Sequence, residues 1–338
     1  MGILAGIDEA GYGPHLGPLV VSAAAMEFDA DPLPEPDLWQ ALAPHVSKQP
    51  SRGAAGVVIC DSKVAYTSGG RLATLERAVL GFLAAAGRRP RTFAELLDTV
   101  AVHPGADCST DGCTAAVAPW EKPETIALPL DASADEIDDA AAHLARGLAA
   151  IGGRPAGLWV NAASASRLNG LIDGRRNKAA ALFTLAADLL GEVLRRGAGG
   201  PVHVTMDRHG GRRYYAGLLS GAFPMTTVET VQESPTQSQY RLLYGGPAGG
   251  DDTGNRSAVR LTVRERCEEA STATALASMA AKYVRELAMR QLNAYFQVRV
   301  PGLRPTAGYG LDAWRFLDDT AAARAAAGVP DAAILRSR

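Results

Sequence analysis

The chain has 338 residues, of which 47% are hydrophobic and 21% charged, and this balance excludes global disorder. It supplies enough apolar material for a sizeable core without structural metals or disulfides. The net charge of −2 disfavours non-specific wrapping of nucleic acid, so such a partner must be held by local basic patches. Sparse cysteines and the lack of a membrane-length apolar run predict a cytoplasmic protein with no membrane partner.

The first half of the chain opens with two buried strands, at residues 2–7 and 18–27, which a Gly/Pro-rich turn joins as an antiparallel pair. Residues 28–50 are rich in proline and acids without periodicity, and we expect a surface excursion there. A short apolar run at 57–60 precedes a predicted helix at about 71–86.

The second half alternates between predicted helices and strands. Within the poorly patterned segment 88–155, a helix is expected at 134–151. The later elements are a strand at 157–161, a helix at about 177–196, a strand at 202–206, a hairpin at about 239–244 and 258–266, and helices at about 271–295 and from about 312. This order predicts an α/β protein whose mixed sheet is flanked by helices.

Acidic residues come at the ends of three predicted strands. Asp8 and Glu9 follow the first strand, Asp207 closes the strand at 202–206, and Glu268 and Glu269 end the hairpin. Singly, each has an ordinary explanation as a turn residue, a cap or an acid that complements a helix dipole. Together they predict a hard-oxygen site for Mg²⁺ or Mn²⁺ and not for zinc. Two such ions about 4 Å apart support phosphodiester cleavage.

The convergence of Asp8 and Glu9 on one site needs a special condition. Neighbouring residues of a strand point to opposite faces of its sheet. We therefore expect the first strand to end at these two acids, where the glycines that follow allow the chain to turn.

Five motifs, in one order and spread over most of the chain, resemble those of ribonuclease HII, the type 2 ribonuclease H. They are GIDEAGYGP with GPLVV at 6–21, Asp61-Ser62-Lys63 before a helix, Asp207 at a strand end, ASMAAK with Arg285-Glu286 at 277–286, and Gly308-Tyr309-Gly310. The closing segment at 334–338 also resembles the basic segment that ends the family's chains.

The resemblance implies a ribonuclease H-like fold, with a mixed five-stranded sheet flanked by helices, and a two-metal site for Mg²⁺ or Mn²⁺. The implied catalytic and metal-binding residues are Asp8, Glu9, Asp207 and Glu268; the last stands ten residues before Ser278, where the family has aspartate, and Glu269 is the second candidate. The implied substrate-binding residues are Gly11, Tyr12, Gly13, Ser62, Lys63, Ser278, Lys282, Arg285 and Tyr309.

The activity implied by the resemblance is endonucleolytic hydrolysis of the RNA strand of RNA–DNA hybrids, giving 5′-phosphate and 3′-hydroxyl ends. The partner would be such a hybrid or ribonucleotide-containing DNA, and we expect a monomer. The alternative is a ribonuclease H-like nucleic-acid-binding protein with weak or no activity. Retention of all four acidic positions favours the enzyme, because clustered carboxylates repel one another without a metal.

The expected domain organisation follows the same resemblance. Residues 1–300 would form the catalytic domain, with insertions at about 28–50 and 88–155 and the hairpin at about 238–266. Residues 301–338 would form a helical extension packed on it. In the second insertion, Cys108 and Cys113 with nearby His103 are too incomplete a motif to favour a metal site over free thiols.

Tyr12 is the main departure from the family, which has arginine between the two glycines of this loop. Gly11 and Gly13 remain, so close backbone approach to a ribose 2′-hydroxyl is expected to survive. Loss of a charge-assisted phosphate contact would cost about 1 kcal/mol, or roughly fivefold in selectivity for a single embedded ribonucleotide. Lys63 or Arg208 is a candidate to replace this phosphate contact.

Two further basic clusters, at 175–178 and 208–213, are either phosphate contacts or solvated surface.

Overall fold

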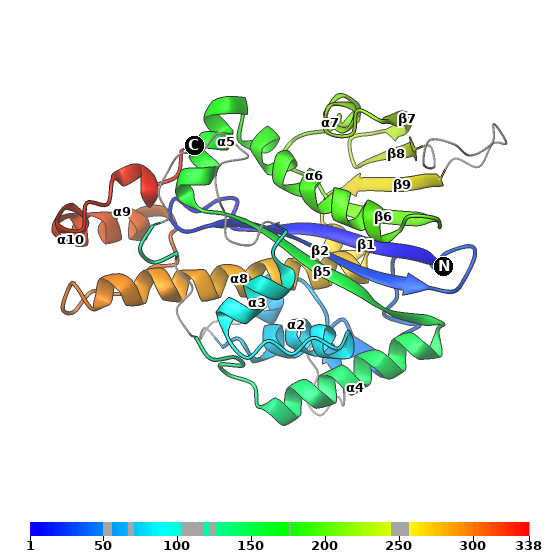
Figure 1. The fold of residues 1–338 in the computed structure, drawn as a ribbon, viewed down its shortest axis with the longest axis horizontal. Coiled ribbons are helices and arrows are strands. Elements are labelled where there is room, and N and C mark those ends of the chain that lie inside the picture. The colour runs from blue at the N-terminus through cyan, green and yellow to red at the C-terminus, as the bar shows by residue number, and fades with distance from the viewer. Residues whose placement is uncertain are drawn as a thin grey trace.

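The structure is a computed structural model that describes residues 1–49, 56–66, 71–102, 118–121, 126–175, 177–244 and 257–337. The cysteines and histidine of the incomplete motif, Cys108, Cys113 and His103, lie outside the described residues. The described chain forms an α/β fold in which helices cover both faces of a central mixed sheet, as predicted (Figure 1).

The central sheet has seven strands among the described residues, in the order β5-β2-β1-β6-β9-β8-β7. They are β1 (Gly2–Ala10), β2 (Leu19–Phe28), β5 (Gly153–Ala163), β6 (Val202–Asp207), β7 (Thr226–Glu233), β8 (Gln237–Tyr244) and β9 (Ser257–Arg264). β1, β6 and β9 are parallel neighbours, whereas β2, β5, β8 and β7 pair antiparallel. The short strands β3 (Val46–Ser47) and β4 (Val57–Val58) pair separately.

The expectation of five strands is wrong, because β8 and β7 extend the sheet beyond β9. The predicted hairpin is present as β8 and β9, and β9 is itself the parallel neighbour of β6. β7 was not predicted. It is an edge strand whose side chains are mostly exposed, so its sequence carries no alternating apolar signal.

Ten α-helices lie in the described residues, and none of them has the length and apolar character needed to cross a membrane. They are α1 (Ser62–Ala65), α2 (Ala73–Ala85), α3 (Phe93–Val100), α4 (Ala134–Ala150), α5 (Ala165–Arg175), α6 (Lys178–Arg196), α7 (Ala216–Ala222), α8 (Thr272–Gln297), α9 (Gly310–Asp319) and α10 (Ala321–Ala326). The helices predicted from periodicity correspond to α2, α4, α6, α8 and α9. The shorter α3, α5 and α7 were not predicted.

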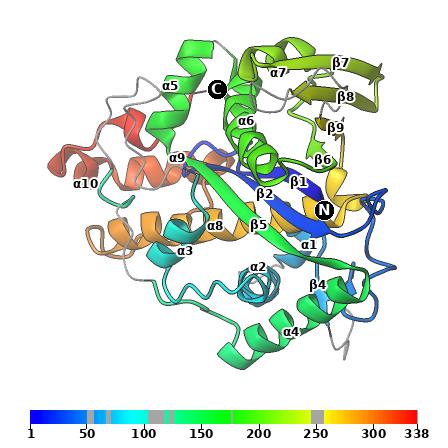
Figure 2. The same ribbon diagram turned by 45° about the vertical axis from the view of Figure 1, so that its right-hand side comes forward.

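Alternating residues of β1 separate the two sides of the core. Leu4 faces the cluster formed with α2 and α8, whereas Ile3, Ala5 and Ile7 face the cluster formed with α5 and α6. Figures 1 and 2 show these helices on opposite sides of the sheet, with α4 outside α2. The strands that carry the candidate acids are therefore buried on both faces.

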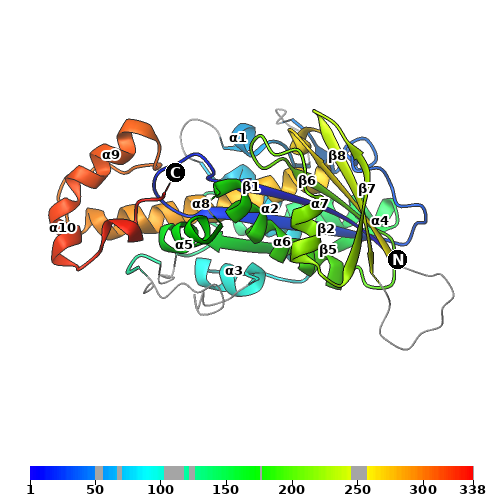
Figure 3. The ribbon, with the colours of Figure 1, turned by 90° about the horizontal axis from the view of Figure 1, so that it is seen from above.

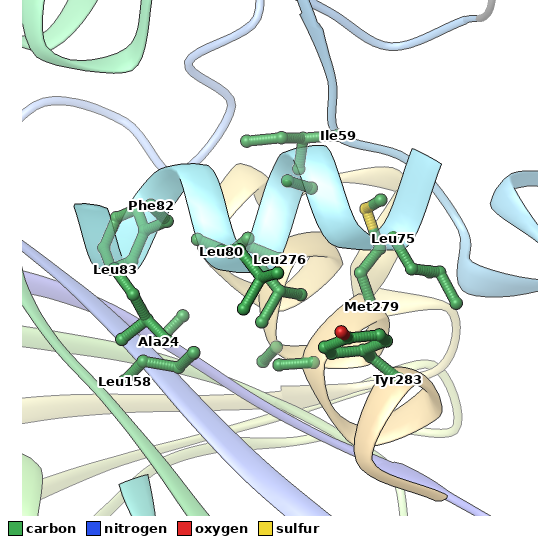
Figure 4. Packing of buried hydrophobic residues seen from close by; sticks show 14 of the residues in the cluster. Ala24, Ile59, Leu75, Leu80, Phe82, Leu83, Leu158, Leu276, Met279 and Tyr283 are labelled. Atoms are coloured by element: carbon green, nitrogen blue, oxygen red, sulfur yellow. The ribbon is translucent and has the colours of Figure 1, made fainter. Parts of the chain in front are cut away.

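Helix α8 packs directly between the sheet and α2. Its side chains lie beside those of α2, and Figure 4 shows Leu276 next to Leu80 and Met279 next to Leu75. The approach to the sheet is closer still at Gly6, where a Cβ atom would lie 2.1 Å from the backbone nitrogen of Thr274. Only glycine permits this contact, and it fixes the start of α8 on β1.

Residues 28–50 are not the surface excursion that their composition suggested. Leu38, Trp39 and Leu42 are buried in the core on the α8 side, and the indole of Trp39 donates a hydrogen bond to the carbonyl oxygen of Ile59 at 2.8 Å. The acids and prolines between these apolar residues obscured any periodic pattern. The described residues of 301–337 pack through Phe316 and Leu317 against Phe296 of α8.

Glu76 of α2 joins the segment before α4 to the core. Its fully buried carboxylate accepts hydrogen bonds from the backbone N–H groups of Leu130, Asp131 and Ala132 at 2.6, 2.9 and 2.8 Å. The hydroxyl of Tyr283 on α8 donates a fourth, at 3.2 Å. One carboxylate thus accepts hydrogen bonds from the backbone N–H groups of a turn, which would otherwise be buried without acceptors.

We predict that Glu76→Ala lowers the free energy of unfolding by about 3 kcal/mol or more, because it leaves several buried donors without an acceptor. Chemical denaturation measures the change. The control is Glu229→Ala, which removes an exposed ion pair with Arg241 and is expected to cost less than about 1 kcal/mol. Equal losses in the two variants would contradict the role given to Glu76.

Candidate metal centre

Three carboxylates meet where β1 and β6 lie side by side. One oxygen from each of Asp8, Glu9 and Asp207 lies within 4.8 Å of the other two. The pairing of β1 with β6 ends at Ile7 and Met206, so the next residue of each strand, Asp8 and Asp207, lies just past the last pair. The sheet register thereby brings together acids that are far apart in the sequence.

The expectation that β1 ends at Asp8 and Glu9 is wrong, because β1 continues to Ala10 in register with β2. The pairing of β1 with β6 does end, at Ile7, so the next residues of β1 have no partner on the β6 side. In addition, the carboxylate of Asp8 accepts a hydrogen bond from the backbone N–H of Glu9 at 2.7 Å. The two neighbouring acids therefore reach one site without a strand end.

The environment of the cluster disfavours full ionisation. Burial, followed by the charges of Glu9 and Asp207, raises the pKa of Asp8 well above its usual value. Burial and the charge of Asp207 raise the pKa of Glu9 to about 8. Burial also raises the pKa of Asp207, although the N–H of Cys267 donates to it at 3.1 Å. Closely spaced carboxylates of this kind are the oxygen donors that Mg²⁺ and Mn²⁺ prefer, so the residues present fit such an ion.

Glu268 lies close enough to this cluster for its charge to act on two of the three carboxyl groups. Glu268 is half-buried, and its charge raises the pKa values of both Asp8 and Glu9. Its own pKa is raised by burial and by Asp207, although its carboxylate lies outside the set of three within 4.8 Å. Glu269 is exposed and pairs with Arg266 at 3.4 Å.

The Asp61-Ser62-Lys63 motif borders the carboxylates. Ser278 Oγ on α8 lies 3.0 Å from Ser62 Oγ, and a hydrogen bond from Ser278 to Asp8 lowers the pKa of that acid against the larger effect of burial. Lys63 is exposed, and its charge lowers the pKa of Glu9. Asp61 caps α1 by accepting from the backbone N–H of Lys63 at 2.8 Å. The motif thus brings an exposed cation and the hydroxyl of Ser62 to the cluster, beside the hydroxyl of Ser278 from α8.

Arg285 is buried beneath the loop between β1 and β2, away from any surface that could meet a substrate. Its guanidinium donates to the carbonyl oxygens of Pro18 and Ala307 at 2.8 and 3.0 Å. Gly11, at φ +89°, approaches so closely that a Cβ atom would lie 2.8 Å from the side chain of Arg285. The guanidinium of Arg285, which the resemblance placed among the substrate-binding residues, therefore supports the loop instead.

Arg336 supports the same loop from the C-terminal segment, which Figure 3 shows beside it. Its buried guanidinium donates to the carbonyl oxygens of Gly17 at 2.6 Å, Pro14 at 3.3 Å and Gly11. Burial lowers the pKa of Arg336 to about 9. The sequence indicated this residue only as part of a basic closing segment.

Two further candidate substrate-binding residues, Tyr309 and Lys282, differ in how far their side chains are exposed. Tyr309 is half exposed beside the glycine loop, since a Cβ atom at Gly13 would lie 4.0 Å from its ring. Lys282 is mostly buried, pairs with Glu286 at 2.6 Å and lies over the ring of Tyr66. Tyr309 thus presents part of its side chain to solvent, although its ring also lies 5.9 Å from the Arg285 guanidinium, whereas Lys282 is engaged within the protein.

No family model and no curated protein matches the chain. Among solved structures, the chain is similar to one in the PCNA:RNase HII complex from Archaeoglobus fulgidus, with 15% identity and a TM-score of 0.44 over 99% of this chain and 94% of that chain. It is also similar to ribonuclease H2 from Pyrococcus horikoshii OT3, with 12% identity and a TM-score of 0.40 over 98% of this chain and 92% of that chain.

The raised pKa values predict a pH-dependent effect of metal on stability. Carboxyls with raised pKa values hold protons in the folded, metal-free protein that the unfolded chain has lost, so stability falls as pH rises from the usual Glu9 value of 4.5 toward about 8. A bound cation takes the place of those protons. We expect the rise in Tm on adding Mn²⁺ to be larger at pH 8 than at pH 6.

The measurement is thermal unfolding with and without Mn²⁺ at both pH values. Asp207→Asn should abolish the metal-dependent rise, whereas Glu229→Gln, on the exposed edge strand, should retain it. A rise of equal size at both pH values would contradict the assignment.

Proposed function

We propose that the protein is a divalent-metal-dependent endoribonuclease that hydrolyses the RNA strand of RNA–DNA hybrids, leaving 5′-phosphate and 3′-hydroxyl ends. The observation that carries the proposal is the buried cluster of Asp8, Glu9 and Asp207, with Glu268 close enough for its charge to act on it. The order of the sequence motifs supports the same assignment, because the motif residues that carry carboxylates, hydroxyls and Lys63 lie around this one cluster.

The cation-binding residues would be Asp8, Glu9, Asp207 and Glu268. Divalent cations, when bound, lower the pKa of water and offset negative charge on phosphate oxygens. Ser278 and the backbone N–H of Glu9 hold the Asp8 carboxylate by hydrogen bonds, while the N–H of Cys267 holds Asp207. These contacts set the positions of the ligands before a cation arrives.

The substrate-binding groups lie around the carboxylates. Lys63 supplies an exposed cation for a backbone phosphate. Gly11 and Gly13 lack side chains that would block the approach of a ribose 2′-hydroxyl to the backbone, which is the group that distinguishes RNA from DNA. Tyr309 presents a half-exposed ring on which a sugar or base can stack.

The experiment that tests the proposal uses an end-labelled RNA–DNA hybrid with Mg²⁺ or Mn²⁺. Cleavage confined to the RNA strand, with 5′-phosphate and 3′-hydroxyl products, is expected, and duplex DNA of the same sequence should remain intact. Tight binding of the hybrid without cleavage would favour the alternative of a nucleic-acid-binding protein. Absence of both would contradict the proposed function.

We predict that Asp8→Asn and Asp207→Asn each lower the cleavage rate about 100-fold or more, because the cations contribute several kcal/mol to the transition state. Asparagine keeps the shape of the side chain and removes its charge. Asp318→Asn, at an exposed position of α9, is the control and should cleave at the wild-type rate. Near-normal Mg²⁺-dependent cleavage by either cluster variant would overturn the metal assignment.

We also predict that Glu268→Gln impairs cleavage much more than Glu269→Gln. Glu268 acts electrostatically on Asp8 and Glu9, whereas Glu269 is exposed and paired with Arg266. The two variants are matched in chemistry and are adjacent in the chain. Rates compared at several Mn²⁺ concentrations should show that Glu268→Gln needs more Mn²⁺ than the wild type, whereas Glu269→Gln does not. Loss confined to Glu269→Gln would reverse the assignment.

A further inference from the structure

Tyr12 contacts charged groups that lie far from it in the sequence. Lys178, the first residue of α6, places its Nζ 5.0 Å from the centroid of the Tyr12 ring. The Tyr12 hydroxyl points to the turn after β6, where a Cβ atom at Gly210 would lie 3.7 Å from it. Arg212 is in that same turn, since its backbone N–H donates to His209. Three segments therefore meet at this tyrosine.

The electrostatic environment places Tyr12 between the carboxylates and a cation. Burial and the charge of Glu9 raise the pKa of Tyr12, whereas the charge of Arg212 lowers it. Both charges are therefore close enough to act on the hydroxyl. The Tyr12 hydroxyl thus lies within electrostatic range of both Glu9 and Arg212.

Arg212 has an unused hydrogen-bond donor at this position. Its Nε is buried and has no hydrogen-bond partner among the described residues. A buried guanidinium donor without an acceptor is unfavourable, and an anion would satisfy it. The side chain as a whole is half-buried, so part of it is open to solvent, unlike that of Arg208.

Arg208, which the sequence offered as the replacement for the missing loop arginine, does not serve this purpose. It is only 5% exposed, and its Nη1 donates to the carbonyl oxygen of Pro235 and to Glu265 Oε1, while its Nε and Nη2 lack partners but are buried as well. Lys63 belongs to the carboxylate side of the site, where its charge lowers the pKa values of Glu9, Asp207 and Glu268. The cations on the Tyr12 side are Lys178 and Arg212.

We propose that Tyr12, Lys178 and Arg212 form a subsite for a backbone phosphate of the nucleic-acid strand, next to the carboxylate cluster. Lys178 and Arg212 supply the permanent positive charge that the loop lacks at position 12. The Tyr12 ring holds the Lys178 ammonium by a cation–π contact, and its hydroxyl can donate to the phosphate. The N-terminus of α6 adds a favourable dipole for an anion. This subsite rests on the proposed function.

The experiment measures binding of an RNA–DNA hybrid to Asp207→Asn protein, in which cleavage is removed, over a range of salt concentrations. Adding Lys178→Ala or Arg212→Ala should each weaken binding about tenfold and lower the slope of log K against log salt by about one, as expected for one lost phosphate contact. The control is Arg195→Ala, which removes an exposed cation at the opposite end of α6. Its slope should be unchanged.

The outcomes distinguish a failure of the proposed function from a failure of the phosphate subsite. Failure of the Asp207→Asn parent to bind the hybrid at all would overturn the proposed function and the subsite with it. Binding by the parent with unchanged slopes in both subsite variants would overturn the subsite alone. Equal weakening by Arg195→Ala would also overturn it, because the effect would then be one of general surface charge.

A charge-relocation test addresses the role of Tyr12. In the Lys178→Ala background, Tyr12→Arg should restore most of the lost affinity, because the new guanidinium can contact the phosphate that the Lys178 ammonium contacted. With Lys178 present, Tyr12→Arg should give no comparable gain, since two cations would then crowd one phosphate. The same gain in both backgrounds would show that Tyr12 and Lys178 act independently and would overturn the shared subsite.

Discussion

The close approach of α8 to β1 at Gly6 is the contact on which the carboxylate site depends. It lets the first turn of α8 lie on the strand that carries Asp8 and Glu9. The hydroxyl of Thr205 on β6 bonds the hydroxyls of Ser271 and Thr274 at 2.7 Å, so the same turn also fixes the neighbouring strand. Ser278, one turn further along α8, then reaches Asp8 and Ser62. A side chain at position 6 would move all of these together.

The positions of the candidate acids were readable from the sequence because each follows a buried apolar strand. The long helices were equally readable, because α6 and α8 are long runs without proline that begin with side-chain caps at Asn177 and Ser271. The sequence could not show that the β1–β6 pairing stops at Ile7 while β1 itself continues. Register between distant strands is a property of the assembled sheet.

Other expectations failed because a motif does not reveal whether a side chain is buried. Arg285 matched a motif in which a basic residue meets phosphate, yet its guanidinium is used by backbone carbonyl groups. Arg208 follows a candidate metal ligand directly and is likewise engaged within the protein. Conversely, nothing in the sequence places Lys178 over Tyr12, because these residues belong to different elements. If the two cations serve as proposed, the lower selectivity expected from Tyr12 is offset.

The support of the glycine loop by Arg336 has a consequence for the synthesis of the protein. The guanidinium that holds the Gly11 carbonyl belongs to a residue 325 positions later in the chain. During translation, β1 and its acids emerge first, and the loop beside them lacks this support until the C-terminal segment has left the ribosome. The loop that follows the first strand therefore gains this support only after residue 336 has been made.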